Sequence, residues 1–128
     1  MTLELKLLVW SAALALIQML IALLAAIAQV GFLPLIGNRE NLAAVEGWAG
    51  RAQRAHHNMM ESLPIFAAVV LVAQIAGKTN AMTALGAELF FWGRLAYAPV
   101  YVIGIRWLRT ALWGVSFAGL LQILLQVL

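Results

Sequence analysis

The chain alternates long hydrophobic runs with short polar segments. No charged residue stands between Leu7 and Asn38, and the apolar part of this stretch, 7–30, is longer than the ~20 residues with which a helix crosses a bilayer. Similar runs cover 54–77, in a helix that should start near Arg51, and 81–103 and 110–127. Short connections make consecutive helices antiparallel neighbours. The pattern predicts one domain, 1–128, an all-α integral membrane protein with four transmembrane helices in an up-down-up-down bundle.

The composition favours the same class of protein. Hydrophobic residues make up 65% of the chain and charged residues 10%, which does not suit the surface of a soluble domain of this size. Cysteine is absent, so thiol chemistry would need a thiol brought by the substrate. The formal net charge of +3 comes without the basic stripe of a nucleic-acid-binding protein, and we expect no nucleic-acid partner.

The arginines indicate which side faces the cytoplasm. The first and third connections carry five of them, whereas the opposite side has only Lys6 and Lys78. The positive-inside rule therefore places the arginines in the cytoplasm and both termini outside, in what we expect to be a bacterial inner membrane. Arginines retained for function would give the same distribution. The five are Arg39, Arg51, Arg54, Arg106 and Arg109.

A polar stripe follows one face of the second predicted helix. Arg51, Arg54, Asn58 and Glu61 are spaced three, four and three residues apart, and His57 lies beside them. The uncharged remainder of that helix is too short to cross the hydrocarbon alone, so Glu61 should lie near or inside its boundary. Ionisable groups at such a depth are usually functional. The alternative is that the stripe only joins helices by polar contacts.

The two histidines do not form a metal-binding pattern. His56 and His57 are adjacent, so their side chains diverge by ~100° around a helix, unlike the i, i+4 pair of a helical zinc site. We expect no metal and place the histidines at the water interface. Pro64 should bend the helix just past Glu61.

The third predicted helix carries a second polar face. Arg94, Tyr97 and Tyr101 are spaced three and four residues apart, and Arg106 and Arg109 follow at the same membrane face. An interfacial aromatic belt is the alternative explanation for Tyr101. Guanidinium groups, a carboxylate, an amide and phenols together suit a small zwitterionic or anionic ligand.

Other polar residues are expected to have structural roles. Glu88 lies on another face of the third helix, and we expect it to pair with Lys78 or Gln74 or to contact another subunit. Four glutamines are predicted to form interhelical hydrogen bonds: Gln18, Gln29, Gln122 and Gln126.

These motifs resemble those of the membrane-associated proteins in eicosanoid and glutathione metabolism, the MAPEG family. The first motif runs from Arg51 to Phe66 as R-x-x-R-A-x-x-N-x-x-E-x-x-P-x-F, and the second as Arg94-x-x-Tyr97-x-x-x-Tyr101, followed by Arg109. The compact chain is similar to bacterial members and to microsomal glutathione transferases. The resemblance implies a homotrimer with a glutathione site at each subunit interface, open to the cytosol and to lipid.

The resemblance also implies roles for single residues. Arg109, or Arg106 as the second candidate, would activate the glutathione thiol. Arg51 and Arg94 would add supporting charge, and glutathione would be held by Arg54, Asn58, Glu61, Tyr97 and Tyr101. The chain departs from the family's eicosanoid enzymes at Gln29 and Val30, where they have arginine, and at Ser62, where leukotriene C4 synthase has tyrosine.

The function predicted from these observations is a membrane-bound glutathione transferase, with peroxidase activity as an additional possibility. Its partners would be glutathione as co-substrate, a lipophilic electrophile, membrane lipid and other copies of the chain. A guanidinium ~4 Å from a thiolate contributes ~4 kcal/mol at an effective dielectric of ~20, enough to lower a thiol pKa of ~8.5 by up to ~3 units before desolvation. The alternatives are a non-catalytic ligand-binding or scaffold member of the same fold and a small four-span efflux transporter.

Overall fold

The computed structural model describes residues 1–37 and 45–128, and all its regular elements are helices. This confirms the all-α fold. The elements are α1 (Leu3–Val30), α2 (Phe32–Ile36), α3 (Gly47–Ile75), α4 (Ala81–Ile103) and α5 (Arg106–Val127). The sequence did not predict α2, and α1, α3 and α5 begin before the predicted spans. Arg39, assigned to the arginine-rich side, lies outside the described residues.

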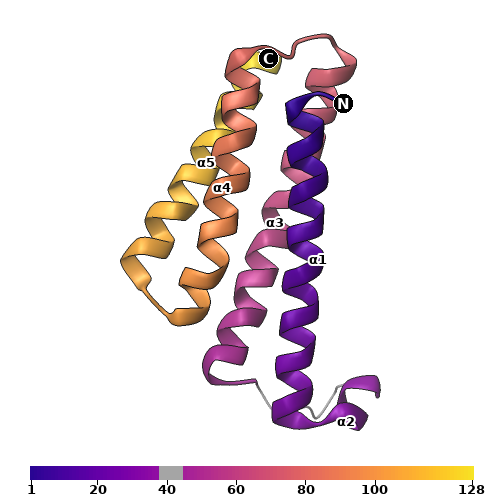
Figure 1. Cartoon of the computed structure of the whole chain (residues 1–128), viewed down its shortest axis with the longest axis vertical. Helices are drawn as coiled ribbons and strands as arrows, with labels where there is room; N and C mark the ends of the chain where they lie inside the picture. Colours follow the sequence, from indigo (N-terminus) through magenta and orange to yellow (C-terminus); the bar gives the residue numbers. More distant parts are fainter. Residues whose placement is uncertain (38–44) are drawn as a thin grey trace.

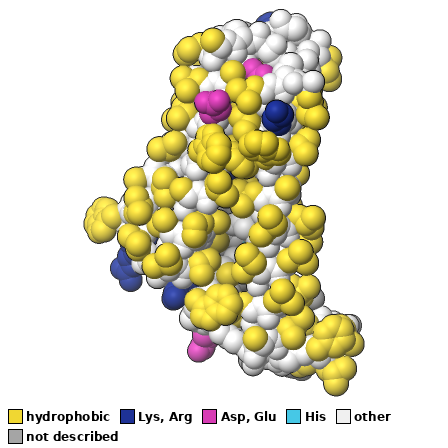
Figure 2. Space-filling view, in the orientation of Figure 1, with side chains coloured by type: hydrophobic (Ala, Val, Ile, Leu, Met, Phe, Trp, Pro, Cys, Tyr) yellow, Lys and Arg dark blue, Asp and Glu magenta, His cyan; other side chains and the backbone are white. Residues whose placement is uncertain are grey.

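Three of the described helices are long and apolar enough to cross a membrane: α1, α3 and α5. Their outer surfaces expose many large hydrophobic side chains, and Figure 2 shows such side chains over most of the visible face, with charged ones toward the two ends. Lipid is the solvent that this surface fits. The helix α4 carries Glu88 and Arg94 and is not among the three, so the fourth span stays a prediction.

The four long helices run antiparallel in sequence order, and both termini lie at the same end (Figure 1). Both α3 and α4 contact each other and both flanking helices, α1 on one side and α5 on the other, whereas α1 and α5 share no contact within the described chain. The pair α3 and α4 therefore forms a wall between two sides of the molecule.

Glycine lets α4 and α5 approach closely. A Cβ atom added at Gly119 would lie 2.4 Å from the backbone oxygen of Gly86, so neither position can hold a larger residue without moving a helix. Between α3 and α4, the stacked rings of Phe66 and Phe90 have centroids 4.0 Å apart and are fully buried. These contacts fix the helices whose other ends carry the polar motifs.

Hydrogen bonds between helices close the end that holds the termini. The Thr83 hydroxyl donates to the buried carboxylate of Glu4 over 2.8 Å, and the Thr2 hydroxyl donates to Gln74 over 2.8 Å. Lys78 donates to the carbonyl of Val127 over 3.1 Å. Neither Lys78 nor Gln74 pairs with Glu88 within the described residues. A subunit contact at Glu88 stays a prediction.

The predicted glutamine contacts are confirmed for three residues. Gln122 donates to the carbonyl of Met82 and Gln126 accepts from Asn80, which joins α4 to α5. Gln29 forms two hydrogen bonds with the backbone of Glu46, next to the first turn of α3. The side-chain amide oxygen of Gln18, in contrast, is buried and has no hydrogen-bond partner in the described chain.

Candidate functional site

Three adjoining pockets lie on the side of the wall that α5 covers. The inner pocket, of about 360 Å³, and the middle pocket, of about 170 Å³, share Asn58 and Trp113. The middle pocket shares Arg109 with the outer pocket, of about 420 Å³. Every site residue predicted from the sequence lines at least one of them: Arg51, Arg54, Asn58, Glu61, Arg94, Tyr97, Tyr101, Arg106 and Arg109.

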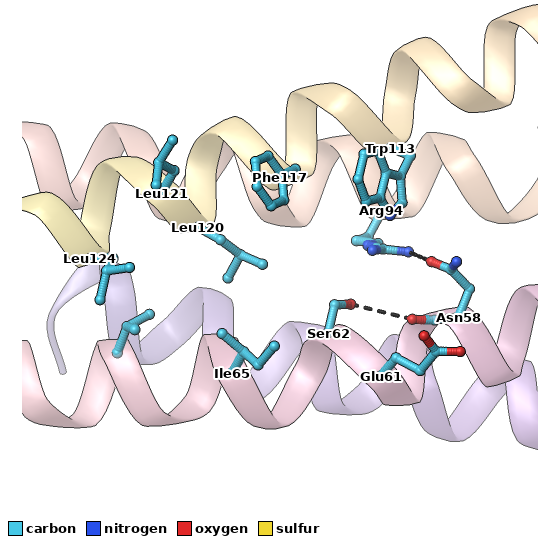
Figure 3. Close-up of a pocket in the computed structure, with 11 residues that line it drawn as sticks. Asn58, Glu61, Ser62, Ile65, Arg94, Trp113, Phe117, Leu120, Leu121 and Leu124 are labelled. Atoms are coloured by element: carbon cyan, nitrogen blue, oxygen red, sulfur yellow. Dashed lines mark hydrogen bonds between the residues drawn. The ribbon is translucent and has the colours of Figure 1, made fainter.

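A hydrogen bond between two of the motifs lies at one end of the inner pocket. Arg94 of α4 donates from Nη1 to Oδ1 of Asn58 on α3 (Figure 3). Arg94 is only 3% exposed, and its Nε is buried without a partner in the described part of the chain. Its guanidinium also lies over the ring of Tyr97, 5.1 Å from the centroid. A buried cation with an unused donor can receive a further polar or anionic group.

Glu61 presents a free carboxylate at the same pocket. Its side chain is exposed, and among residues 1–37 and 45–128 it accepts no hydrogen bond and forms no ion pair. Figure 3 shows it next to Asn58, across the pocket from Trp113 and Phe117. Ser62 is committed elsewhere, because its hydroxyl donates to the carbonyls of Met59, over 3.1 Å, and Asn58, over 3.5 Å.

Arg109 connects the middle and outer pockets. Its guanidinium carbon lies 4.3 Å from the centroid of the Tyr101 ring, a cation–π contact that fixes the side chain. The rings of Tyr97 and Tyr101 are 5.5 Å apart, so both phenols stand near this arginine. Arg106, the other candidate for activating a thiol, lines only the outer pocket and is exposed.

Arg51 caps the end of α4, a structural role that the sequence analysis did not predict. Its Nε donates to the carbonyl of Val102 over 2.7 Å, one of the last carbonyls of α4, which lack partners within the helix. The cation also favours the negative end of the helix dipole. A Cβ at Gly104, where φ is +98°, would lie 3.5 Å from that Nε. Arg51 therefore holds the turn that carries Arg106 and Arg109.

Several lining residues were missed by the sequence analysis. Trp113, Phe117, Leu120, Leu121 and Leu124 of α5 and Ile65 and Val69 of α3 form the apolar part of the inner pocket, and Thr110 lines the middle one. The α5 residues recur every three or four positions, which is a visible helical face. In a helix that is apolar all round, however, the period does not distinguish a pocket from a lipid-facing surface.

The histidines lie apart from this site. The rings of His56 and His57 are 6.2 Å apart, and neither residue lines the three pockets. Within the described residues, no three histidine, aspartate or glutamate side chains gather as a metal site would require. The chemistry available here is therefore that of cations, phenols, an amide and a carboxylate beside an apolar groove.

Comparison with known proteins gives one match. The sequence model of the MAPEG family matches residues 7–128, which include all the site residues. No curated protein and no solved structure matches the chain. The chain therefore belongs to the MAPEG family of integral membrane proteins, and this membership suggests a role in glutathione or eicosanoid metabolism.

Proposed function

We propose that the protein is a homotrimeric glutathione transferase, which joins the glutathione sulfur to lipophilic electrophiles at the edge of the membrane. The observation that carries the proposal is the order of the three pockets. Arginines and Tyr101 line the outer pocket, Tyr97 and Arg109 line the middle one, and apolar side chains line most of the inner one. A cationic pocket, followed by a pocket with a phenol and an arginine and then by an apolar pocket, suits an anionic peptide whose thiol must meet a molecule dissolved in lipid.

The outer pocket offers charges for the ends of glutathione. Arg54 and Arg106 form no hydrogen bond or ion pair in the described chain and are exposed, so both are available to the two carboxylates. Glu61, which lines the inner pocket, is the free carboxylate for the amino group. The amide nitrogen of Asn58 and the Nε of Arg94 would donate hydrogen bonds to the peptide carbonyls. These contacts fix the tripeptide so that its sulfur points to the middle pocket.

Arg109 is the residue we assign to thiol activation. The guanidinium stabilises the thiolate, and the thiol proton leaves to water at the open outer pocket. The nearby Tyr97 and Tyr101 hydroxyls can donate to the sulfur. Arg106 is the weaker candidate, because it lines only the outer pocket.

The second substrate would occupy the apolar part of the inner pocket. From Trp113 to Leu124 this wall of α5 extends about 16 Å along the helix, enough for an aliphatic or aromatic body. The thiolate forms a carbon–sulfur bond with the electrophilic carbon. The carbon's bond to the leaving group breaks, and that group departs with the electron pair; where a strained ring opens instead, its oxygen keeps the pair and stays on the product, and either anion takes a proton from water.

The single chain leaves the site open, which favours assembly. Glu61 and Arg54 line an open face of the pockets and are exposed in the single chain, and a carboxylate facing lipid is costly. A neighbouring copy that covers this face would enclose the site and remove that cost. Native mass spectrometry of the protein in detergent should show three copies. A monomer that retains full activity would contradict the trimer.

The absence of cysteine makes the proposed sidedness easy to test. Lys78→Cys and Trp107→Cys place single thiols at opposite ends of the bundle, and both positions are exposed. With the termini outside a bacterial inner membrane, an impermeant maleimide added to spheroplasts should label Lys78→Cys and spare Trp107→Cys. The reverse labelling would invert the topology.

The principal test is the ultraviolet absorbance of the glutathione thiolate near neutral pH. Wild-type protein in detergent should show the signal, Arg109→Ala should lose it, and Arg106→Ala should keep most of it. We expect Arg109→Ala to lower the conjugation rate by about 10²-fold. If both variants kept the wild-type signal and rate, the assignment would be wrong. Binding measured by calorimetry without turnover would instead favour a non-catalytic scaffold.

A further inference from the structure

A second groove lies on the opposite side of the α3–α4 wall. It has a volume of about 410 Å³ and shares only Ile103 with the three pockets of the proposed glutathione site. Its walls come from α1 and α4 and its floor from α3. The lining residues are Leu14, Ile17, Gln18, Ile21, Ala52, Ala55, Leu95, Ala98, Pro99, Val102 and Ile103.

Small side chains create this hollow. Ala52 and Ala55 stand where α3 passes behind α1 and α4, and Ala98 stands on the α4 side. Larger residues at these three positions would fill the space, as Phe66 and Phe90 do nearer the termini. The volume falls in the range of ~300–1,000 Å³ that is usual for small-molecule sites.

Gln18 is the one residue with a polar side chain in the lining. It lies near the middle of α1, a helix apolar and long enough to cross the membrane, and it is 7% exposed. Its Oε1 is buried and accepts no hydrogen bond from residues 1–37 or 45–128. Hydrocarbon offers no donor to such an oxygen, so an unmet acceptor at this depth is costly.

We propose that this groove binds a long-chain aliphatic molecule that carries a hydroxyl group, which donates to Gln18. A plain acyl chain would fill the groove but leave the oxygen unmet. From Leu95 to Ile103 the groove extends about 12 Å along α4 toward the arginine end. There Val102, whose carbonyl accepts from Arg51, lines it. Arg51 itself lines the outer pocket and not this groove, so an acidic head group would lie beyond the groove at the membrane edge, while the hydroxyl lies in mid-membrane.

The test uses 12-hydroxyoctadecanoic acid with a diazirine near its methyl end, added to the full-length protein in phosphatidylcholine nanodiscs. After irradiation, peptide mass spectrometry should place the label within 14–21 or 95–103. Unlabelled 12-hydroxyoctadecanoic acid should compete at a concentration about fivefold lower than octadecanoic acid, which corresponds to one ordinary hydrogen bond.

Two variants examine the two features of the groove separately. Gln18→Leu keeps the volume and should remove the preference for the hydroxylated competitor. Ala98→Leu fills the groove and should abolish labelling, whereas the matched control Ala118→Leu, on an exposed position of α5, should label like wild type. Thermal unfolding identifies any variant that fails to fold.

Three outcomes would overturn the proposal. Labelling outside the groove, or labelling unchanged by Ala98→Leu, would remove the site. Equal competition by both acids, unaffected by Gln18→Leu, would mean that any acyl chain fills it. A photo-crosslinking residue placed at Ala98 that joined two protein chains would show that a second copy covers the groove. None of these outcomes depends on glutathione conjugation, so the proposed function is tested separately.

Discussion

The two ends of the bundle differ in whether their polar side chains have hydrogen-bond partners. At the end with the termini, polar groups from different helices satisfy one another: Thr83 donates to Glu4, Thr2 to Gln74, and Asn80 to Gln126. These bonds tie α1 to α4, α1 to α3, and the start of α4 to α5. Most of the hydrogen-bonding capacity there is used inside the protein.

At the arginine end, several donors and acceptors have no hydrogen-bond partner within the described residues. Arg54, Arg106 and Glu61 form no hydrogen bond or ion pair within the described residues, and Arg94 has a buried nitrogen without a partner there. Polar groups near a bilayer are expensive unless something satisfies them. Groups that satisfy one another stabilise the fold, whereas groups left over indicate a ligand or another subunit.

The largest effect is expected from removing one unused cation. Arg54→Gln should raise the Kd for glutathione by about 10- to 100-fold, the loss of a charge-assisted hydrogen bond. The thermal stability of the empty protein should not change. Lys78→Gln, the matched change at the opposite end, should leave the Kd within about twofold of wild type, because Lys78 donates to Val127. Calorimetry with both variants measures the two Kd values. An equal loss of glutathione affinity in both would mean that the two ends do not differ in ligand binding.

The next effect concerns the bond that joins α3 to α4 within the site. Asn58→Leu leaves the buried guanidinium of Arg94 without its acceptor, and we expect the free energy of unfolding to fall by about 2 kcal/mol. Glutathione binding should also weaken. Unfolding in denaturing detergent, followed by circular dichroism, measures the first effect. Asn58→Asp keeps an acceptor and should restore stability. Failure of that rescue would contradict the role of the bond.

The helices and the polar stripes were predictable from the sequence because both depend on local periodicity. Uninterrupted apolar runs identified the long helices, and spacings of three and four put Arg54, Asn58 and Glu61 on one face. All nine predicted site residues line the three pockets. Their roles in binding and catalysis stay predictions.

Contacts between helices were harder to predict, because a helical pattern gives the face of a residue but not its partner. Arg51 was interpreted as a supporting charge, yet it caps α4 through Val102. Gln29, at a position where eicosanoid enzymes of the family have arginine, binds the backbone beside α3. Glu4 and Thr83, which form a buried hydrogen bond, are separated by most of the chain. No local sequence pattern indicates that they meet.

A smaller effect is expected at the closed end. Thr83→Val keeps the shape of the side chain but removes the hydroxyl that donates to Glu4 and accepts from the backbone of Asn80 at the start of α4. We expect a loss of about 1–2 kcal/mol in the free energy of unfolding. The Kd for glutathione should not change. Thr79→Val, at a neighbouring threonine whose side chain forms no hydrogen bond with residues 1–37 or 45–128, serves as the control. A change in glutathione affinity would mean that the two ends are coupled.

The smallest effect should come from Gln126→Leu, which removes the acceptor for Asn80 at an exposed position. Interhelical hydrogen bonds in membrane proteins average about 0.6 kcal/mol, because the unfolded chain in the membrane also finds partners. A loss near that value, measured by the same unfolding assay, would mean that the closed end owes its stability to several weak bonds. A loss as large as that of Asn58→Leu would instead place a dominant contact there. Stability and ligand binding would then no longer be divided between the two ends.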